Sequence, residues 1–424
     1  MRWPAGLFLL LLLLGCGGRD DGKVRLELWG LGREGEVVRE LIPDFERENP
    51  GIVVQVQQIP WTAAHEKLLT AFVGDATPDV AQIGNTWIPE LAELQALEKL
   101  GARVAATPDF APDDFFPGFW QSGLVGGELW AVPWYVDTRL FFYRKDLLAA
   151  AGASEFPRSW SEWRRVAEKL YRGERQRAIL LPTDEWVQPV ILALGQGAEL
   201  VEGGRFGAFR RPEVRAAWDF YLGFFRDGLA PASSQNQIAN LYQQFAAGEF
   251  AMVITGPWNI GEFSRRLPPE LADAWETAPM PAPDGASWPG ASLAGGSSLV
   301  LFRGSRHPDE AFKLITYLTR RRNLLRLNEL CGDLPPRPSA WKEAGLGQRP
   351  HFAAFEKQLE AARPTPLLPE WERIATTVGE RLEAAIRGQA SLDETLVKLD
   401  AEVDRMLEKR RYLLDLRQRK DGAR

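Results

Sequence analysis

The sequence contains little cysteine and little histidine, which limits the kinds of site that it can form. Only two cysteines, Cys16 and Cys331, and three histidines occur among the 424 residues. The histidines, His65, His307 and His351, lie far apart, and no cysteine or second histidine stands at metal-ligand spacing from any of them. We therefore expect no zinc site, no other bound metal and no cofactor.

Long apolar runs are also scarce, and the clearest one is at the start of the chain. Leu7 to Leu14 follows the positive Arg2 and is much shorter than the roughly 20 residues that a membrane span needs. A short apolar run after a positive residue is typical of an export signal. The run ends in Leu13-Leu14-Gly15-Cys16, which resembles the bacterial lipobox, where the cysteine is lipidated and becomes the mature N-terminus.

We predict a signal peptide over residues 1–15, a lipidated Cys16 that holds the protein to a membrane surface, and a polar tether over residues 16–23. The alternative is an ordinary secretory signal with a chance cysteine. Lipidation of Cys16 leaves only Cys331, so no internal disulfide is expected. The remaining 424 − 15 = 409 residues are too many for one hydrophobic core and suit two domains of average size.

Positive charge is not in excess. The formal net charge is −6 and no basic stripe occurs, so the composition does not support nucleic-acid binding. Tryptophan, in contrast, is abundant, with sixteen Trp against seven Tyr. Indole can stack on the apolar C–H faces of sugar rings, while carboxylates and amides bind their hydroxyl edges. The composition therefore favours a carbohydrate ligand.

Strand and helix patterns alternate along the chain, which is typical of βαβ units and an α/β class. Residues 24–29 alternate apolar and charged side chains as a strand does, and residues 37–45 carry apolar side chains at helical spacing, with Pro43 expected to kink this helix or to start its second half. Another strand, helix and strand follow at 52–56, 62–72 and 78–83.

The stretch Gly248–Ile260 combines a strand with an aromatic residue at its end. Ala251 to Ile254 has the composition of a buried strand, and Gly256-Pro257 breaks it immediately before Trp258. Ligands of open α/β sheets lie beyond the carboxyl ends of the strands. By itself this stretch leaves two interpretations of Trp258 open, a wall of a ligand site or a core residue.

Several motifs in a fixed order resemble one known family. Besides the lipobox, these are Leu28-Trp29-Gly30, Phe45 to Gly51, Thr77-Pro78-Asp79-Val80, Phe142 to Leu148, Pro157 to Trp160 and Phe245 to Trp258. Together they resemble the family 1 extracellular solute-binding proteins of ABC importers, in particular the maltodextrin-binding-like group. The resemblance spans essentially the whole mature chain.

The resemblance implies the two-lobe periplasmic-binding-protein fold, in which discontinuous α/β domains are joined by a hinge and the ligand lies in a cleft between them. We expect crossings near residues 135–138, 278–281 and 328–336. The expected parts are an N-terminal lobe of residues 24–135 and 279–330, a C-terminal lobe of residues 136–278 and 331–416, and a frayed tail at 417–424.

The residues that the resemblance and the strand-end positions suggest for binding are Trp29, Glu36, Asn85, Trp87, Asp137, Asp184, Trp186, Trp258, Gly296, Arg337 and Trp371. Asn85 offers a donor and an acceptor, and Gly295-Gly296 would let backbone amides approach a sugar. The position of Asp137 carries an acidic ligand in the family, and that of Trp258 a stacking aromatic.

Several of these assignments have a structural alternative. Glu36, near Arg33 and Glu34 in the first turn, could be a partner of the helix dipole, and Asn85 could be a helix cap. Arg139 could neutralise Asp137. Among the other candidates, Trp371 could be a core residue, and Arg337 could connect the lobes.

We expect no catalytic residues, because the sequence has no nucleophile elbow, P-loop or dinucleotide fingerprint. The predicted function is a monomeric, extracytoplasmic receptor for a mono- to oligosaccharide, with a disaccharide favoured, that delivers its ligand to an ABC permease. One alternative is a lipoprotein glycosidase with a carboxylate pair such as Asp137 and Asp184, which would need to lie about 5–10 Å apart. Another is a receptor for a non-sugar solute such as glycerol phosphate.

Overall fold

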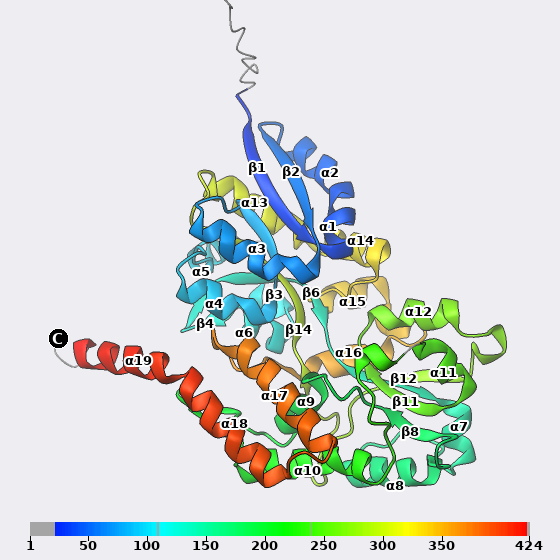
Figure 1. Cartoon of the computed structure of the whole chain (residues 1–424). Coiled ribbons are helices and arrows are strands. Elements are labelled where there is room, and N and C mark those ends of the chain that lie inside the picture. Colours follow the sequence, from blue (N-terminus) through cyan, green and yellow to red (C-terminus); the bar gives the residue numbers. More distant parts are fainter. Residues whose placement is uncertain (1–21, 108–109, 239, 422–424) are drawn as a thin grey trace, which may run out of the picture.

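A computed structural model of the chain describes residues 22–107, 110–238 and 240–421. The predicted signal peptide, the predicted lipidation site Cys16 and most of the predicted tether therefore lie outside the described residues. No helix in the described ranges is long and apolar enough to cross a bilayer. The chain forms two α/β units, each built around a sheet of its own (Figure 1).

The first sheet has five strands in the order β2-β1-β3-β14-β6. Their bounds are β1 Val24–Leu31, β2 Ile52–Ile59, β3 Val80–Gly84, β6 Ala131–Asp137 and β14 Gly295–Leu301. Strand β1 is parallel to β2 and β3, whereas β14 is antiparallel to both of its neighbours. The sheet is buried on both faces, since Leu28 of β1 packs in one apolar cluster and Trp29 in another.

Helices cover both faces of this sheet. One face carries α1 Gly32–Val37, α2 Ile42–Glu48, α13 Pro308–Leu318 and α14 Arg321–Cys331, and the other carries α3 Trp61–Val73 and α4 Ile88–Glu93. Pro43 lies in the first turn of α2, so it starts the second half of the helical segment as predicted. The same unit holds α5 Gly101–Ala105, α6 Pro117–Ser122, β4 Leu124–Val125 and β5 Glu128–Leu129.

The second sheet has four strands in the order β12-β7-β11-β8. Their bounds are β7 Leu140–Arg144, β8 Arg177–Leu180, β11 Phe250–Thr255 and β12 Trp275–Ala278. Met252 and Ile254 of β11 pack in the cluster that contains α8 (Trp160–Leu170), and Val253 packs in the cluster of α11 (Leu241–Ala247) and α12 (Trp258–Arg266). The apolar run of β11 is thus a strand buried on both faces.

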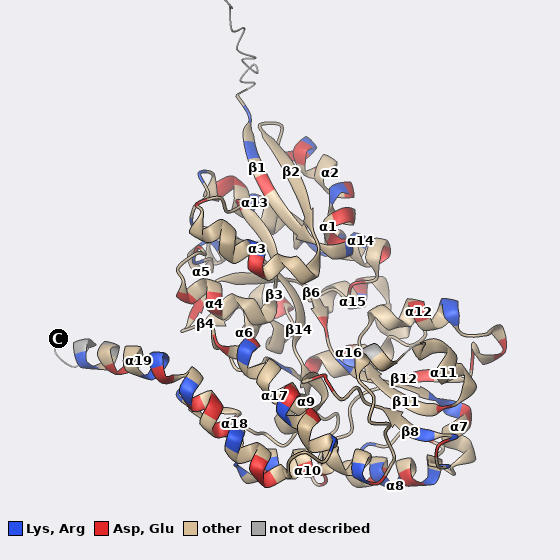
Figure 2. Ribbon diagram, viewed as in Figure 1, with Lys and Arg blue, Asp and Glu red and all other residues tan. Residues whose placement is uncertain are grey.

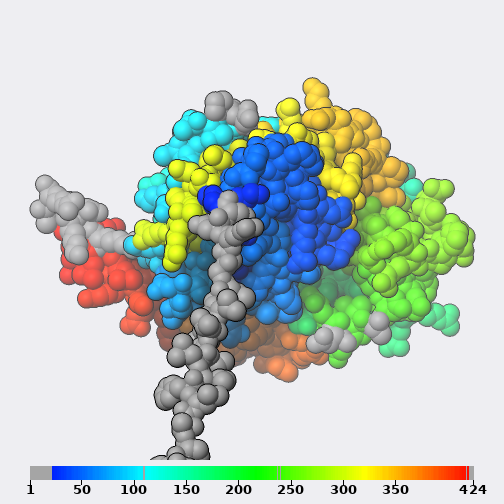
Figure 3. Space-filling view, turned by 90° about the horizontal axis from the view of Figure 1, so that it is seen from above, coloured from blue at the N-terminus to red at the C-terminus, as the bar shows by residue number. Residues whose placement is uncertain are grey.

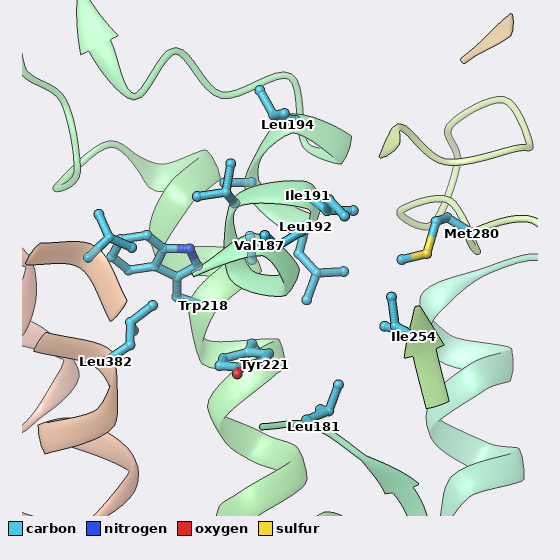
Figure 4. Packing of buried hydrophobic residues seen from close by; sticks show 14 of the residues in the cluster. Leu181, Val187, Ile191, Leu192, Leu194, Trp218, Tyr221, Ile254, Met280 and Leu382 are labelled. Atoms are coloured by element: carbon cyan, nitrogen blue, oxygen red, sulfur yellow. The ribbon is translucent and has the colours of Figure 1, made fainter. Parts of the chain in front are cut away.

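The core of the second unit also takes in the helices near the C-terminus. Trp218 donates its indole N–H to the carbonyl of Pro189 at 3.0 Å, and Leu382 lies next to its ring (Figure 4). The helices of this unit are α7 Lys145–Ala150, α9 Val187–Gly195, α10 Pro212–Arg226, α15 Pro338–Ala344, α16 Ala353–Glu360, α17 Trp371–Ile386 and α18 Leu392–Met406. Short paired strands complete it, β9 Val201–Glu202 with β10 Phe206–Gly207 and β13 Ser292–Leu293 with β15 Ala362–Arg363.

The chain passes between the two units three times. The crossings lie after Asp137, between Ala278 and Gly295, and after Cys331. Residues near 300–330 lie against N-terminal residues on the face seen from above (Figure 3), so the first unit is discontinuous in sequence. Met280 packs in the second core, not the first. We therefore propose that the chain changes lobe after Asp137, before Gly295 and after Cys331. The predicted divisions fall after residues 135, 278 and 330.

The last described helix, α19 Glu408–Asp421, continues past the residue at which we predicted fraying to begin. An ion pair of 2.8 Å between Arg410 and Glu370 holds it to the start of α17, and Arg205 pairs with Asp415. Residues 417–421 are thus helical. Both acidic and basic residues occur along α18 and α19 (Figure 2).

Candidate ligand-binding site

Asp137 and Trp258 come together although they belong to different sheets. Asp137 ends β6 of the first sheet, and Trp258 begins the helix that follows β11 of the second. The Arg139 guanidinium donates to both carboxylate oxygens of Asp137, at 3.0 and 3.1 Å, and its central carbon lies 4.3 Å from the centre of the Trp258 ring. Trp258 is 49% exposed. An accessible aromatic face therefore lies beside an acidic group.

Glycines allow the close approach of backbone and side chains in this region. Gly296 has a φ of +91°, and a Cβ there would lie 2.5 Å from the carbonyl oxygen of Tyr135. At Gly256, a Cβ would fall 1.9 Å from the Trp258 ring. Larger residues would separate β14 from β6 at the first position and displace the indole at the second. That the amide of Gly296 contacts a ligand stays a prediction.

Asn85 supports the site from within the first sheet. Its side-chain amide donates to the carbonyl of Gly295 at 2.8 Å, and its oxygen accepts from the hydroxyl of Ser298 at 2.8 Å. The side chain is 4% exposed. Both of its polar atoms thus have protein partners, and it caps no helix. Asn85 fixes β14 to the end of β3, so the alternative role as a helix cap is wrong, and its role as a ligand residue stays a prediction.

Trp87 forms an aromatic pair with a residue that the sequence analysis did not select. Its ring meets Trp61 edge-on at 5.7 Å and lies 5.1 Å from the ring of His65. Trp61 begins α3 and packs so closely on Gly32 that a Cβ there would lie 2.6 Å from the indole. Trp87 and Trp61 remain partly exposed, so they are available as an aromatic wall on the first unit.

Glu34, rather than Glu36, is the acidic residue of the first turn that faces inward. It is 8% exposed, and its Oε2 has no hydrogen-bond partner among the described residues. A buried carboxylate oxygen without a partner is costly in free energy. Glu36 instead lies on the outer side of α1, exposed, and pairs with Arg33 at 2.7 Å. Glu36 is therefore a surface residue, and Glu34 takes its place as a candidate.

Glu34 belongs to an acidic group at the third crossing. Burial raises the pKa of Asp333 well above its ordinary value, and the nearby carboxyl of Glu34 raises it further. Burial also raises the pKa of Tyr135, with Glu34, Asp333 and Asp137 adding to the effect. Beside this group, Cys331 Sγ lies 3.1 Å from Asp333 Oδ2, and burial raises the pKa of the thiol. The side chains of the first turn, of β6 and of the third crossing are thus electrostatically coupled.

Trp29 lies in the core beneath α3, in the apolar cluster against which Trp87 also packs. Its indole N–H donates to Glu27 at 2.7 Å, and the Lys67 ammonium lies 4.7 Å from its ring centre. It is 5% exposed and borders a surface hollow of about 470 Å³ with residues of α3. We had predicted that Trp29 lies at a strand end, but two further residues of β1 follow it. Because side chains alternate along a strand, Trp29 points to the opposite face of the sheet from Leu28.

Arg337 and Trp371 have structural partners. Arg337 donates to Asp114 at 2.8 Å and to the carbonyl of Thr319 at 3.2 Å, so it connects the lobes, as the alternative interpretation proposed. Trp371 is completely buried in the second core and meets Trp186 edge-on at 5.7 Å. These contacts favour the structural alternative for both residues, and a ligand contact of either stays a prediction.

Asp184 and Trp186 lie beside α17. The exposed Asp184 accepts a hydrogen bond from the backbone of Gln235 at 2.9 Å. A Cβ on Gly379 of α17 would lie 3.7 Å from the Cβ of Trp186. Asp184 and Trp186 thus contact Gln235 and α17, and a ligand role for them stays a prediction. Among the residues that the structure describes, no group of three or more His, Cys, Asp or Glu could hold a metal ion.

Comparison with known proteins places this arrangement in a family. The family model for bacterial extracellular solute-binding proteins matches residues 29–323, so the chain belongs to that family. The predicted family and the predicted two-lobe α/β fold are thereby confirmed.

Individual relatives agree over nearly the whole chain. The solved structure of the sugar-binding protein MalE from the phytopathogen Xanthomonas citri is 45% identical, with a TM-score of 0.89, and the match covers 92% of this chain and 99% of that one. An uncharacterized lipoprotein from Streptomyces antibioticus is 30% identical, over 88% of this chain and 86% of its own length. The diacetylchitobiose binding protein DasA from Streptomyces coelicolor is 26% identical, over 91% and 92%.

Proposed function

We propose that the protein is the sugar receptor of an ABC importer, which binds a mono- to oligosaccharide between its two lobes and catalyses no reaction. The observation that carries this proposal is the meeting of Asp137 and Trp258, one from each sheet, next to the crossings that join the lobes. The similarity to a protein named as sugar-binding, at 45% identity, supports it.

The polar and aromatic groups present match the two faces of a sugar. The exposed part of the Trp258 indole would stack on ring C–H groups, and Trp61 with Trp87 would cover another part of the ligand. Asp137 keeps acceptor capacity beyond the two bonds from Arg139, because a carboxylate offers about four lone-pair sites. Glu34 Oε2, which is buried and has no hydrogen-bond partner among the described residues, would accept a hydrogen bond from a ligand hydroxyl once it is exposed.

Binding at this place would couple the ligand to the relative position of the lobes. A ligand that contacts both Asp137 and Trp258 favours the arrangement that brings both within reach, which is hinge closure. We propose that the closed receptor, a monomer tethered through a lipidated Cys16 outside the cytoplasmic membrane, delivers its ligand to the permease subunits. A disaccharide would span from the Trp258 side to the Trp61 and Trp87 pair.

The proposal is tested by titrating intrinsic tryptophan fluorescence with a panel of mono-, di- and oligosaccharides, and by measuring the melting temperature with each. A true ligand at a hundredfold excess over Kd stabilises the folded state by about 2.7 kcal/mol. If no sugar alters either signal while glycerol phosphate does, the protein is a receptor for another solute. Release of product from an aryl glycoside would instead indicate a glycosidase.

A further inference from the structure

We propose that Arg139 is a positioning residue of this site, whose guanidinium fixes the indole of Trp258 on the second lobe against the carboxylate of Asp137 on the first. This inference rests on the proposed sugar-binding function of the same site. Arg139 itself need not touch the ligand. It acts by holding the aromatic face in the orientation that binding requires.

The side chain of Arg139 is held on two sides. It is 17% exposed and the carboxylate of Asp137 22% exposed, so the pair is largely withdrawn from water. One nitrogen of the guanidinium donates to both carboxylate oxygens, and its central carbon lies 4.3 Å from the centre of the Trp258 ring. A cation over an aromatic face is attracted to it more strongly when both are partly desolvated.

The backbone of Arg139 is fixed as well. The hydroxyl of Ser292 accepts from the Arg139 amide at 3.1 Å and donates to the Arg139 carbonyl at 2.6 Å. Ser292 is fully buried and lies in the second crossing. Arg139 lies in the first crossing, between the strands β6 and β7. One serine thus joins two crossings at the residue whose side chain joins the two lobes.

Arginine suits this place better than any other side chain. Its planar guanidinium can pair with a carboxylate through its edge and stack on an aromatic ring through its face, whereas a lysine ammonium is a point charge. Without Arg139, the Trp258 ring would keep its contact with Gly256 but lose the contact over its face. The ligand would then have to order the indole on binding, which weakens affinity.

The test compares sugar affinity in Arg139→Met, Arg139→Lys, Trp258→Ala and the double variant Arg139→Met/Trp258→Ala. We expect Arg139→Met to weaken binding about tenfold, Arg139→Lys to lie between it and the wild type, and the double variant to bind no more weakly than Trp258→Ala. Arg158→Met is the matched control, because Arg158 also lies over an indole, that of Trp288 at 4.9 Å, and pairs with Glu155. It should leave affinity unchanged.

Two results would overturn the proposal. If the losses of sugar affinity multiply in the double variant, Arg139 binds the ligand directly. If Arg139→Met binds sugar within twofold of the wild type, Arg139 does not position Trp258 for binding. A measurement without ligand distinguishes these two results from a failure of the proposed sugar-binding function. The emission of Trp258, obtained by subtracting the spectrum of the matching Trp258→Ala variant, should shift on Arg139→Met. An unchanged spectrum contradicts the proposal even if no sugar is found to bind.

Discussion

Replacing Glu34 by Gln should make the protein more stable and a weaker receptor. The substitution keeps the shape of the side chain and removes the charge of a group that is 8% exposed and lies next to Asp333. Within the part of the chain that the structure describes, Oε2 of this group has no hydrogen-bond partner. A residue that only supports the fold would not show these opposite effects, because a structural substitution lowers stability. Loss of function with gain of stability is the signature of a group that is strained until its ligand arrives.

The size of both effects follows from the partners of Glu34. Leaving a buried polar atom unpaired costs about 1–3 kcal/mol, so relief of part of this cost should raise the unfolding free energy by about 1 kcal/mol. For a chain of this length the unfolding entropy is on the order of 0.8 kcal/mol/K, so the melting temperature would rise by only about 1 °C. A hydrogen bond to a charged acceptor is about 1.5 kcal/mol stronger than one to a neutral acceptor, which predicts a Kd about tenfold higher.

Urea unfolding measures the first effect, since the midpoint resolves 1 kcal/mol better than a melting curve does for a large protein. Fluorescence titration with the best sugar of the panel measures the second. Glu36→Gln is the control, because Glu36 lies two residues away, is exposed and pairs only with Arg33 at the surface. Lower stability of Glu34→Gln with unchanged affinity would refute the reasoning and make Glu34 a structural residue.

Four further outcomes are expected. Trp258→Ala should raise Kd roughly 50- to 100-fold, because a ligand could cover about 100 Å² of the exposed half of the indole at about 25 cal/mol/Å². Thermal shift assays should show that the melting temperature falls by only a few degrees. Burial and Glu34 raise the pKa of Asp333, so the folded state holds the Asp333 proton more tightly than the unfolded state does, and stability falls as pH rises above about 4. Asp333→Asn should remove this fall of the unfolding free energy with pH, measured by urea unfolding. The hydrogen bond to Glu90 raises the pKa of His65, so its contribution is full below about pH 6.5 and lost as pH rises through the folded value; melts of His65→Gln between pH 5 and 8 should lack that loss. Cys16→Ser should move the protein from the membrane fraction to the soluble fraction.

Local patterns placed Trp258 at a strand end, because it follows a buried strand and a Gly-Pro break, but they left its role open. Asp137, which ends an apolar strand, was assigned as a candidate by the resemblance to the family. The same pattern was present at Pro60-Trp61, after the strand β2, and would have identified Trp61. That residue was missed although the signal was available.

Other residues depend on contacts that no local pattern contains. Glu34 and Glu36 both lie in α1, and successive helical residues turn by about 100°, so the sequence of one short turn does not tell which carboxylate faces inward. Asp333 comes close to Glu34 only because the third crossing returns to the first sheet. Arg337 and Trp371 were assigned to the ligand by resemblance, whereas Asp114 and the second core are their actual partners.

The position of β14 has a consequence for how the chain acquires its fold. This strand lies between β3 and β6 in the first sheet, yet residue 295 is reached only after about 70% of the 424 residues have been made, including every strand of the second sheet. Until then β3 and β6 each have an open edge, which invites mispairing with other chains. The first lobe therefore cannot be completed until every strand of the second sheet has been made, and the second lobe in turn waits for its last helices, α15 to α18.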